Sequence, residues 1–118
     1  MKESVFREKS FKFAVRVVNL YKYLCDKKKE FVLSKQVLRS GTSVGAMLRE
    51  ATYAESKSDF VHKLSIAQKE MNETAYWLEL LKETGYISGK NFESIYGDAL
   101  EVLKMITSSI KTLKSKPN

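Results

Sequence analysis

Apolar residues recur along the chain at alternating spacings of four and three residues, in four stretches separated by short polar segments. This spacing places the apolar side chains on one face of an α-helix, whereas a half-buried strand would alternate at every second residue. Proline is absent before Pro117, so no residue interrupts a long helix. The pattern therefore predicts four amphipathic helices. In chain order, their expected core positions are Phe13, Val17, Leu20 and Leu24; Val37, Gly41, Val44, Leu48 and Ala51; Phe60, Leu64, Ala67, Met71, Thr74, Leu78 and Leu81; Phe92, Tyr96, Ala99, Leu103, Ile106, Ile110 and Leu113.

Polar residues beside these stretches predict where the first three helices begin. The first helix is expected from about Val5 to Lys27. Ser34 is a candidate N-cap for the second helix, because a serine hydroxyl can accept hydrogen bonds from the free backbone N–H groups of a first turn. Ser56 followed by Asp59 resembles a capping box, with aspartate in place of the usual glutamate, and is expected to open the third helix.

The last connection carries two further signals. Gly85 is expected to adopt the left-handed conformation that commonly closes a helix, with Ile87 folded back onto the last turn. Ser88 is a candidate cap for the fourth helix. All the connections are short, and short connections place successive helices antiparallel. We therefore predict an all-α, up-down-up-down four-helix bundle that forms a single domain over residues 1–118.

Gly41 and Gly45 interrupt the second helix with residues that weaken it, each costing about 1 kcal/mol relative to alanine. Gly41 falls on the apolar face, and Gly45 lies beside it. We expect these glycines to let two helix axes approach closely, so that tighter packing offsets their cost.

Arg39 and Glu73 lie at equal distances in sequence on either side of Ser56, where the chain turns back. Folding the second and third helices against each other at this turn would place the two side chains opposite each other. We predict an ion pair between them; the alternative is that both point to solvent.

Three segments resemble a known family: LRSGTSVGAMLREA, DFVHKLSIA and KEMNETAYWLELL. They are similar to the bacterial four-helix-bundle family of 23S ribosomal RNA intervening-sequence proteins, whose relatives include the accessory variability determinant of diversity-generating retroelements. The resemblance implies a homopentamer with a basic surface and no known catalysis. The retroelement relatives bind nucleic acid and a reverse transcriptase, so the resemblance suggests both kinds of partner here.

A formal net charge of +7 and a pI near 9.5 favour an anionic partner. The basic residues form a stripe on the first helix, expected opposite its apolar face, a run in the following loop and a group at the C-terminus. The candidate nucleic-acid-binding residues are Lys9, Lys12, Arg16, Lys27, Lys28, Lys29, Lys111, Lys114 and Lys116. Such residues contact phosphates without reading bases, so binding to RNA or DNA should weaken with salt and show little selectivity. The alternative is a solvated basic face with no ligand.

Several large apolar residues fall outside the core positions, and not all of them can be buried in one bundle. They are Met47, Tyr53, Ile66, Tyr76 and Trp77. Aromatic residues and methionine are enriched at protein interfaces, so we predict that they mediate self-association. The alternative is that some lie at the edge of the core.

The chain offers little for catalysis or for a metal. His62 is the only histidine, so the second half of a helical-bundle di-iron site cannot be built. Cys25 is the only cysteine and is expected to be a small core residue. Glu70 and Glu73 could form an acid–base pair, but no nucleophile accompanies them, and pairing with Arg39 is the expected alternative. We therefore expect no enzyme activity, no metal and no cofactor.

No apolar run approaches the roughly 20 residues that cross a bilayer, and the charged segment MKESVFREKSFKF does not resemble a secretory signal. We expect a cytoplasmic protein with no membrane partner. Two functions remain open: an oligomeric module that binds nucleic-acid backbones, and an adaptor that docks another polypeptide such as a reverse transcriptase.

Overall fold

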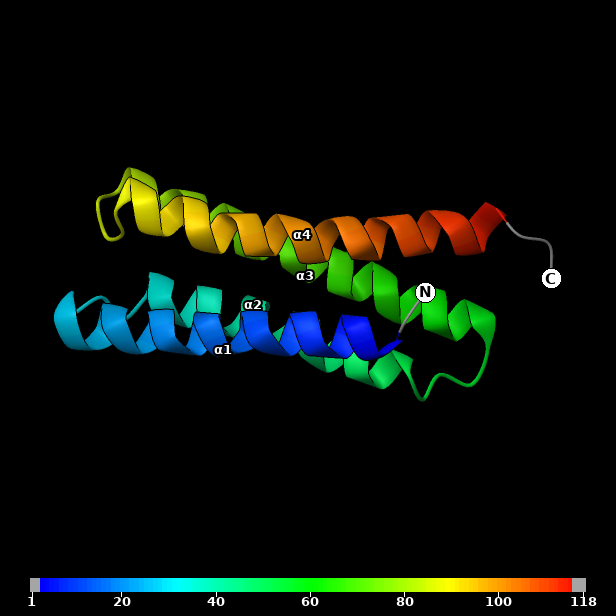
Figure 1. Cartoon of the computed structure of the whole chain (residues 1–118). Coiled ribbons are helices and arrows are strands. Elements are labelled where there is room, and N and C mark those ends of the chain that lie inside the picture. Colours follow the sequence, from blue (N-terminus) through cyan, green and yellow to red (C-terminus); the bar gives the residue numbers. More distant parts are fainter. Residues whose placement is uncertain (1–2, 116–118) are drawn as a thin grey trace.

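Four long α-helices make up the computed structural model, which describes residues 3–115. They are α1 (Glu3–Lys27), α2 (Leu33–Ala51), α3 (Lys57–Glu83) and α4 (Gly89–Ser115). No strand occurs within the described residues. Successive helices run antiparallel along a bundle of about 50 × 21 × 20 Å, and α4 returns beside α1 (Figure 1). The predicted all-α, up-down-up-down four-helix bundle is confirmed.

Three of the predicted helix boundaries have the expected geometry. The Ser56 hydroxyl accepts a hydrogen bond from the Asp59 backbone N–H at 3.1 Å, and the Asp59 carboxylate accepts one from the Glu55 N–H at 3.2 Å. Gly85 has φ +83°, and Ile87 is buried. Ser88 accepts from the backbone N–H of Asn91 at 3.1 Å. Local sequence signals therefore set the start of α3, its end and the start of α4.

The prediction that Ser34 caps α2 is wrong. The helix begins at Leu33, and Ser34 is a buried residue inside it, whose hydroxyl donates to the Glu30 carbonyl oxygen at 2.9 Å. The cap comes instead from the Glu30 carboxylate, which accepts from the backbone N–H groups of Val32, Leu33 and Ser34 at 2.7 to 3.1 Å. A carboxylate stabilises a helix N-terminus more strongly than a hydroxyl, because it adds a favourable charge to the hydrogen bonds.

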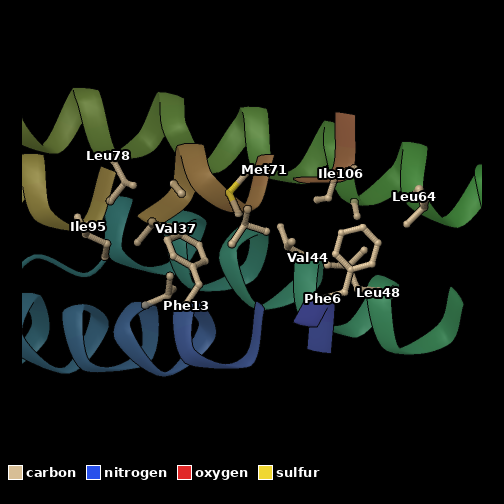
Figure 2. Close-up of a cluster of buried hydrophobic side chains, with 14 of the residues drawn as sticks. Phe6, Phe13, Val37, Val44, Leu48, Leu64, Met71, Leu78, Ile95 and Ile106 are labelled. Atoms are coloured by element: carbon tan, nitrogen blue, oxygen red, sulfur yellow. The ribbon is translucent and has the colours of Figure 1, made fainter. Parts of the chain in front are cut away.

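The core runs the length of the bundle and takes side chains from all four helices (Figure 2). Phe13 of α1, Leu48 of α2 and Leu78 of α3 are all buried as predicted. On α4 the buried face is turned relative to the prediction. The buried apolar residues of α4 are Ile95, Ala99, Val102, Ile106 and Ile110, whereas Phe92, Tyr96, Leu103 and Leu113 are only partly buried.

Gly41 lies where α1 and α2 approach most closely. A Cβ atom at Gly41 would lie 2.8 and 2.9 Å from the two methyl carbons of Val17, which is too close for any real side chain. Gly45 leaves more room, since its nearest neighbour would be the Ser10 carbonyl oxygen at 3.6 Å. The expected close approach is therefore confirmed at Gly41, while Gly45 allows ordinary contact with α1.

Polar contacts join α2 to α3 along the same register that the hairpin predicted. Arg39 forms ion pairs with Glu73 at 2.5 Å and with Glu70 at 3.3 Å, and these contacts raise the pKa of Arg39, chiefly through the hydrogen bond to Glu73. Deeper in the interface, the Thr74 hydroxyl donates to the buried Ser40 hydroxyl at 2.8 Å. The predicted pair of Arg39 and Glu73 is confirmed, and Glu70 extends it.

Candidate nucleic-acid interface

The basic residues of α1 do not form a free stripe opposite its apolar face. Lys9 and Arg16 lie on the side of α1 that faces α4, where Lys9 pairs with Glu101 at 2.8 Å and Arg16 pairs with Asp98 at 2.7 Å. The hydrogen bond to Glu101 raises the pKa of Lys9. The contact between α1 and α4 is the least extensive of the four between neighbouring helices, and these pairs bridge it. Lys9 and Arg16 are therefore partly neutralised by α4, which corrects the expected arrangement.

Arg16 is held more firmly than Lys9. Besides the pair with Asp98, its guanidinium donates to the Ser94 carbonyl oxygen at 3.2 Å and to the Ser94 hydroxyl at 3.0 Å. Lys12 is more exposed, and its ammonium lies 3.9 Å from the Glu8 carboxylate one turn earlier. Of the basic residues on α1 singled out from the sequence, Lys12 therefore remains the most available to a ligand.

The loop between α1 and α2 presents a group of exposed lysines that we call the turn cluster: Lys27, Lys28 and Lys29. Lys27 lies 3.8 Å from the Asp26 carboxylate, whereas Lys28 and Lys29 form no ion pair within the described residues. Lys29 adopts φ 53°, and the next residue, Glu30, is buried beneath the loop as the cap of α2. Burial of Glu30 by itself raises its pKa, but the backbone donors outweigh burial and leave the pKa lowered. The cluster is thus displayed on a well-anchored turn.

A second group of exposed lysines lies at the opposite end of the bundle. Lys111 and Lys114 are on the last turns of α4, near the start of α1 (Figure 1), and neither forms an ion pair within residues 3–115. We call them the terminal cluster. Lys116, predicted with them, lies outside the described residues. The two clusters occupy opposite ends of a bundle about 50 Å long, so one short ligand contacts only one of them on a single chain.

The residues predicted to mediate self-association divide into two groups. Tyr53 and Tyr76 are exposed, with 82% and 56% of their surfaces accessible. Met47 and Trp77 are partly buried against the core, and Ile66 is also partly buried. The Trp77 indole N–H is buried without a hydrogen-bond partner.

Two further exposed apolar residues, Phe11 and Val15, lie on α1 and were not singled out from the sequence. Their positions fall one turn apart on the outer side of the helix. An interhelical groove of about 290 Å³ lies beside Phe11, where small residues of α1 and α2 face each other. Its lining is Arg7, Ser10, Phe11, Ala14, Thr42, Gly45, Ala46 and Arg49.

A second groove, of about 260 Å³, lies between α1 and the start of α4. It is lined by Arg16, Asn19, Leu20, Tyr23, Ile87, Asn91 and Ile95. Sequence reasoning missed this groove because its two walls are far apart in the chain. The one local signal was the spacing of Asn19 and Tyr23, which places both on the same side of α1.

The residues considered for catalysis or metal binding are not brought together as a reactive site. Glu70 and Glu73 both pair with Arg39. His62 is exposed, and Cys25 is partly buried with its sulfur 3.7 Å from the Ser34 hydroxyl. Within the described residues, no three side chains of the histidine, cysteine, aspartate and glutamate types are grouped as metal ligands.

None of the helices in the described part of the chain combines the length and apolar character needed to span a bilayer.

Antiparallel helices with lysines displayed at both ends define a small all-α bundle whose surface suits anionic ligands. The chain belongs to the family of 23S rRNA-intervening sequence proteins, whose model matches residues 2–108. This confirms the family resemblance inferred from the sequence.

Similarity to a solved structure agrees with this assignment. That structure is described as a protein with unknown function from the S23 ribosomal protein family of Bacteroides thetaiotaomicron, and it shares 58% sequence identity with this chain. The match covers 94% of this chain and 99% of the other, with a TM-score of 0.92. No curated protein matches the chain.

Proposed function

We propose that this protein is a non-enzymatic, cytoplasmic homo-oligomer, with five subunits, that binds the phosphate backbones of RNA or DNA through its lysine clusters. The observation that carries the proposal is the display of Lys28, Lys29, Lys111 and Lys114, all exposed and without an acidic partner within the described residues. A lysine already paired with a carboxylate must give up that contact to bind a phosphate, whereas a free lysine only releases bound counterions.

Assembly of several copies would strengthen this attraction. Each chain carries a formal charge of +7, and a ring repeats each lysine cluster once per subunit. Clusters at the same end of neighbouring bundles would then lie within reach of one continuous nucleic-acid strand. Multivalent contact of this kind raises the apparent affinity without any new type of contact.

The test is a salt titration of binding to RNA and to DNA. Affinity should fall steeply with salt, with a slope of about 0.7 to 0.9 in log–log terms for each phosphate contacted. Absence of binding at low salt would overturn the proposal. Lys28→Gln should reduce the slope by roughly one such increment per engaged subunit. Lys28 is preferred to Lys29 for substitution because of the positive φ of Lys29.

Lys9→Gln is the matched control for this experiment. It changes the net charge by the same amount as Lys28→Gln, but Lys9 is engaged by Glu101. We expect a clearly smaller change in affinity and in salt slope. Equal effects of the two substitutions would mean that net charge alone governs binding and that no particular lysine cluster is an interface.

A second candidate function is that of an adaptor for another polypeptide, such as a reverse transcriptase. The groove between α1 and α2 favours it, because Phe11 is 58% exposed there and the flanking Arg7 and Arg49 form no ion pair within residues 3–115. An acidic segment carrying an apolar side chain would complement this surface.

A reverse-transcriptase gene beside the gene for this chain would supply the partner to test. Phe11→Asp should then abolish co-purification of the enzyme while leaving nucleic-acid binding by the lysine clusters in place. Undiminished co-purification of the Phe11→Asp variant would exclude this groove as the docking site.

A further inference from the structure

The groove between α1 and α4 has a composition that the lysine clusters alone do not explain. Its floor is apolar and is formed by Leu20, Ile87 and Ile95, of which the two isoleucines are buried. On its rim, Tyr23 is 41% exposed. A partly exposed aromatic ring beside an apolar floor offers surfaces on which another flat ring can stack.

The rim also carries hydrogen-bonding groups that nothing in the chain satisfies. The side-chain amides of Asn19 and Asn91 are exposed and make no hydrogen bond within the described part of the chain. Each amide offers both a donor and an acceptor, the combination that the edge of a nucleobase requires. At one end of the groove, Arg16 is fixed in place by Asp98 and Ser94.

The other end of the groove leads to the turn cluster. Lys27 follows Tyr23 by four residues on the same side of α1, about 6 Å along the helix axis. Lys28 and Lys29 come directly after it and are free of ion pairs within residues 3–115. A phosphate chain lying on these lysines would therefore bring its bases to the level of Tyr23.

We propose that the groove between α1 and α4 binds one unpaired base of a single-stranded nucleic acid, stacked on Tyr23, while the adjoining phosphates lie against Lys27, Lys28 and Lys29. This inference rests on the proposed function, since it names the form of nucleic acid that the turn cluster serves. A base inside a duplex is already stacked and paired, so a duplex can reach the lysines but not the groove.

Other occupants of this groove match its chemistry less well. An apolar helix from a partner or from a second copy of the chain would cover Asn19 and Asn91 without satisfying their amides, which costs free energy. A nucleobase fits both the apolar floor and the polar rim, and the lysines beyond the groove complement its phosphates.

The experiment measures binding by fluorescence anisotropy to three labelled probes: a single-stranded RNA without self-complementarity, the single-stranded DNA of the same sequence, and the corresponding RNA duplex. Tyr23→Ala should weaken binding to the single strands about fivefold to 100-fold and change duplex binding less than about twofold. Tyr23→Phe keeps the ring and should bind as the wild type does. Tyr23→Leu keeps apolar bulk without a stacking ring and should behave as Tyr23→Ala, which separates stacking from loss of packing.

Tyr53→Ala is the control, because it removes an exposed tyrosine at the opposite end of the bundle. It should change binding to none of the three probes. Equal losses on single strands and duplex for Tyr23→Ala, or no loss on any probe, would overturn the base-binding groove while leaving backbone binding by the lysines intact. Failure of the wild type to bind any probe at low salt would overturn both proposals. A loss confined to RNA or to DNA supports the groove and identifies the sugar that it accepts.

Discussion

Individual residues in this bundle differ in role even where their types are the same. Gly41 removes a clash with Val17, whereas Gly97 on α4 has no atom within 4 Å of the place where its Cβ would be. Lys9 is paired with Glu101, whereas Lys28 is free of ion pairs within the described residues. Residue type and helical position therefore do not reveal the role; the neighbour across the helix interface does.

Gly41→Ala tests this contrast. Alanine should gain about 1 kcal/mol of helix propensity, but its Cβ would overlap both methyl groups of Val17, and overpacking of a core costs about 1–3 kcal/mol. We expect a net decrease in the free energy of unfolding, measured by urea denaturation monitored by circular dichroism. Adding Val17→Ala should make the cost of the glycine substitution smaller, because the overlapping methyl groups are removed.

Gly97→Ala serves as the matched control at an open helical position. It should increase the free energy of unfolding by up to about 1 kcal/mol, since it gains propensity without a clash. If Gly41→Ala were as stabilising as Gly97→Ala, close packing of α1 on α2 would not be the reason for Gly41.

At the scale of a helix, the start of α2 is the element least well predicted from the sequence. Serine followed by an apolar run is typical of a hydroxyl N-cap, but a carboxylate four residues earlier takes that role. The left-handed conformation of Lys29 turns the chain so that Glu30 points back under the first turn of α2. The caps at Ser56, Gly85 and Ser88 could be predicted because each depends only on residues within a few positions.

Glu30→Gln should lower the stability of the protein by about 1–2 kcal/mol at neutral pH, because an amide oxygen is a weaker acceptor at a helix N-terminus. The pKa of Glu30 is lowered from its ordinary value of 4.5 by folding, so its charge stabilises the folded chain above that pH. This contribution disappears as the pH falls through the lower pKa of the folded state.

Urea denaturation of the two proteins at about pH 7 and about pH 3 checks this expectation. The difference in unfolding free energy between wild type and Glu30→Gln should narrow at the lower pH. A difference that is constant across this range would mean that the charge of Glu30 does not contribute to the cap. Glu55→Gln, at an exposed position in the next loop, is the control and should have little effect at either pH.

For the molecule as a whole, the placement of charge and apolar surface suggests how copies assemble. The free lysines gather at the two ends, while the exposed aromatic residues Phe11 and Tyr76 lie along the sides, on α1 and α3. A side-by-side arrangement of bundles would bury the aromatic residues and keep lysine clusters of different copies at common ends. This arrangement fits the proposed oligomer better than an end-to-end one, which would bring like charges together.

Light scattering coupled to size exclusion should give a mass of five chains for the wild type. Tyr76→Glu should lower that mass, because it places a charge in the proposed interface. Thr112→Glu, at an exposed position on α4, adds the same charge elsewhere and should leave the mass unchanged. A wild-type mass of one chain would exclude self-association, and an unchanged mass for Tyr76→Glu would exclude its face of α3.

Trp77 shows why the predicted interface residues cannot all be tested in the same way. It packs against the core, so a charged residue at this position would disturb folding as well as any contact between copies. Tyr76, its neighbour in sequence, is exposed and avoids this ambiguity. From the sequence alone the two residues were equivalent, because both fall outside the regular apolar spacing.

The amino-acid sequence by itself determined the number of helices, most of their core positions, three of their caps and the family. These features depend on spacings within one helix or one turn, where the period of the α-helix is a sufficient guide. Even the pair of Arg39 and Glu73 follows from one hairpin, since a short connection fixes the register of the two helices that it joins.

Only the tertiary structure decided which basic residues are free, how α4 is turned toward the core, and which side chains meet in the groove beside Tyr23. Lys9 and Glu101 are separated by 92 residues, and Arg16 and Asp98 by 82. The register between α1 and α4 is set by the packing of all four helices together, because no direct connection joins these two. A lysine's partner across that interface therefore has no local signature in the sequence.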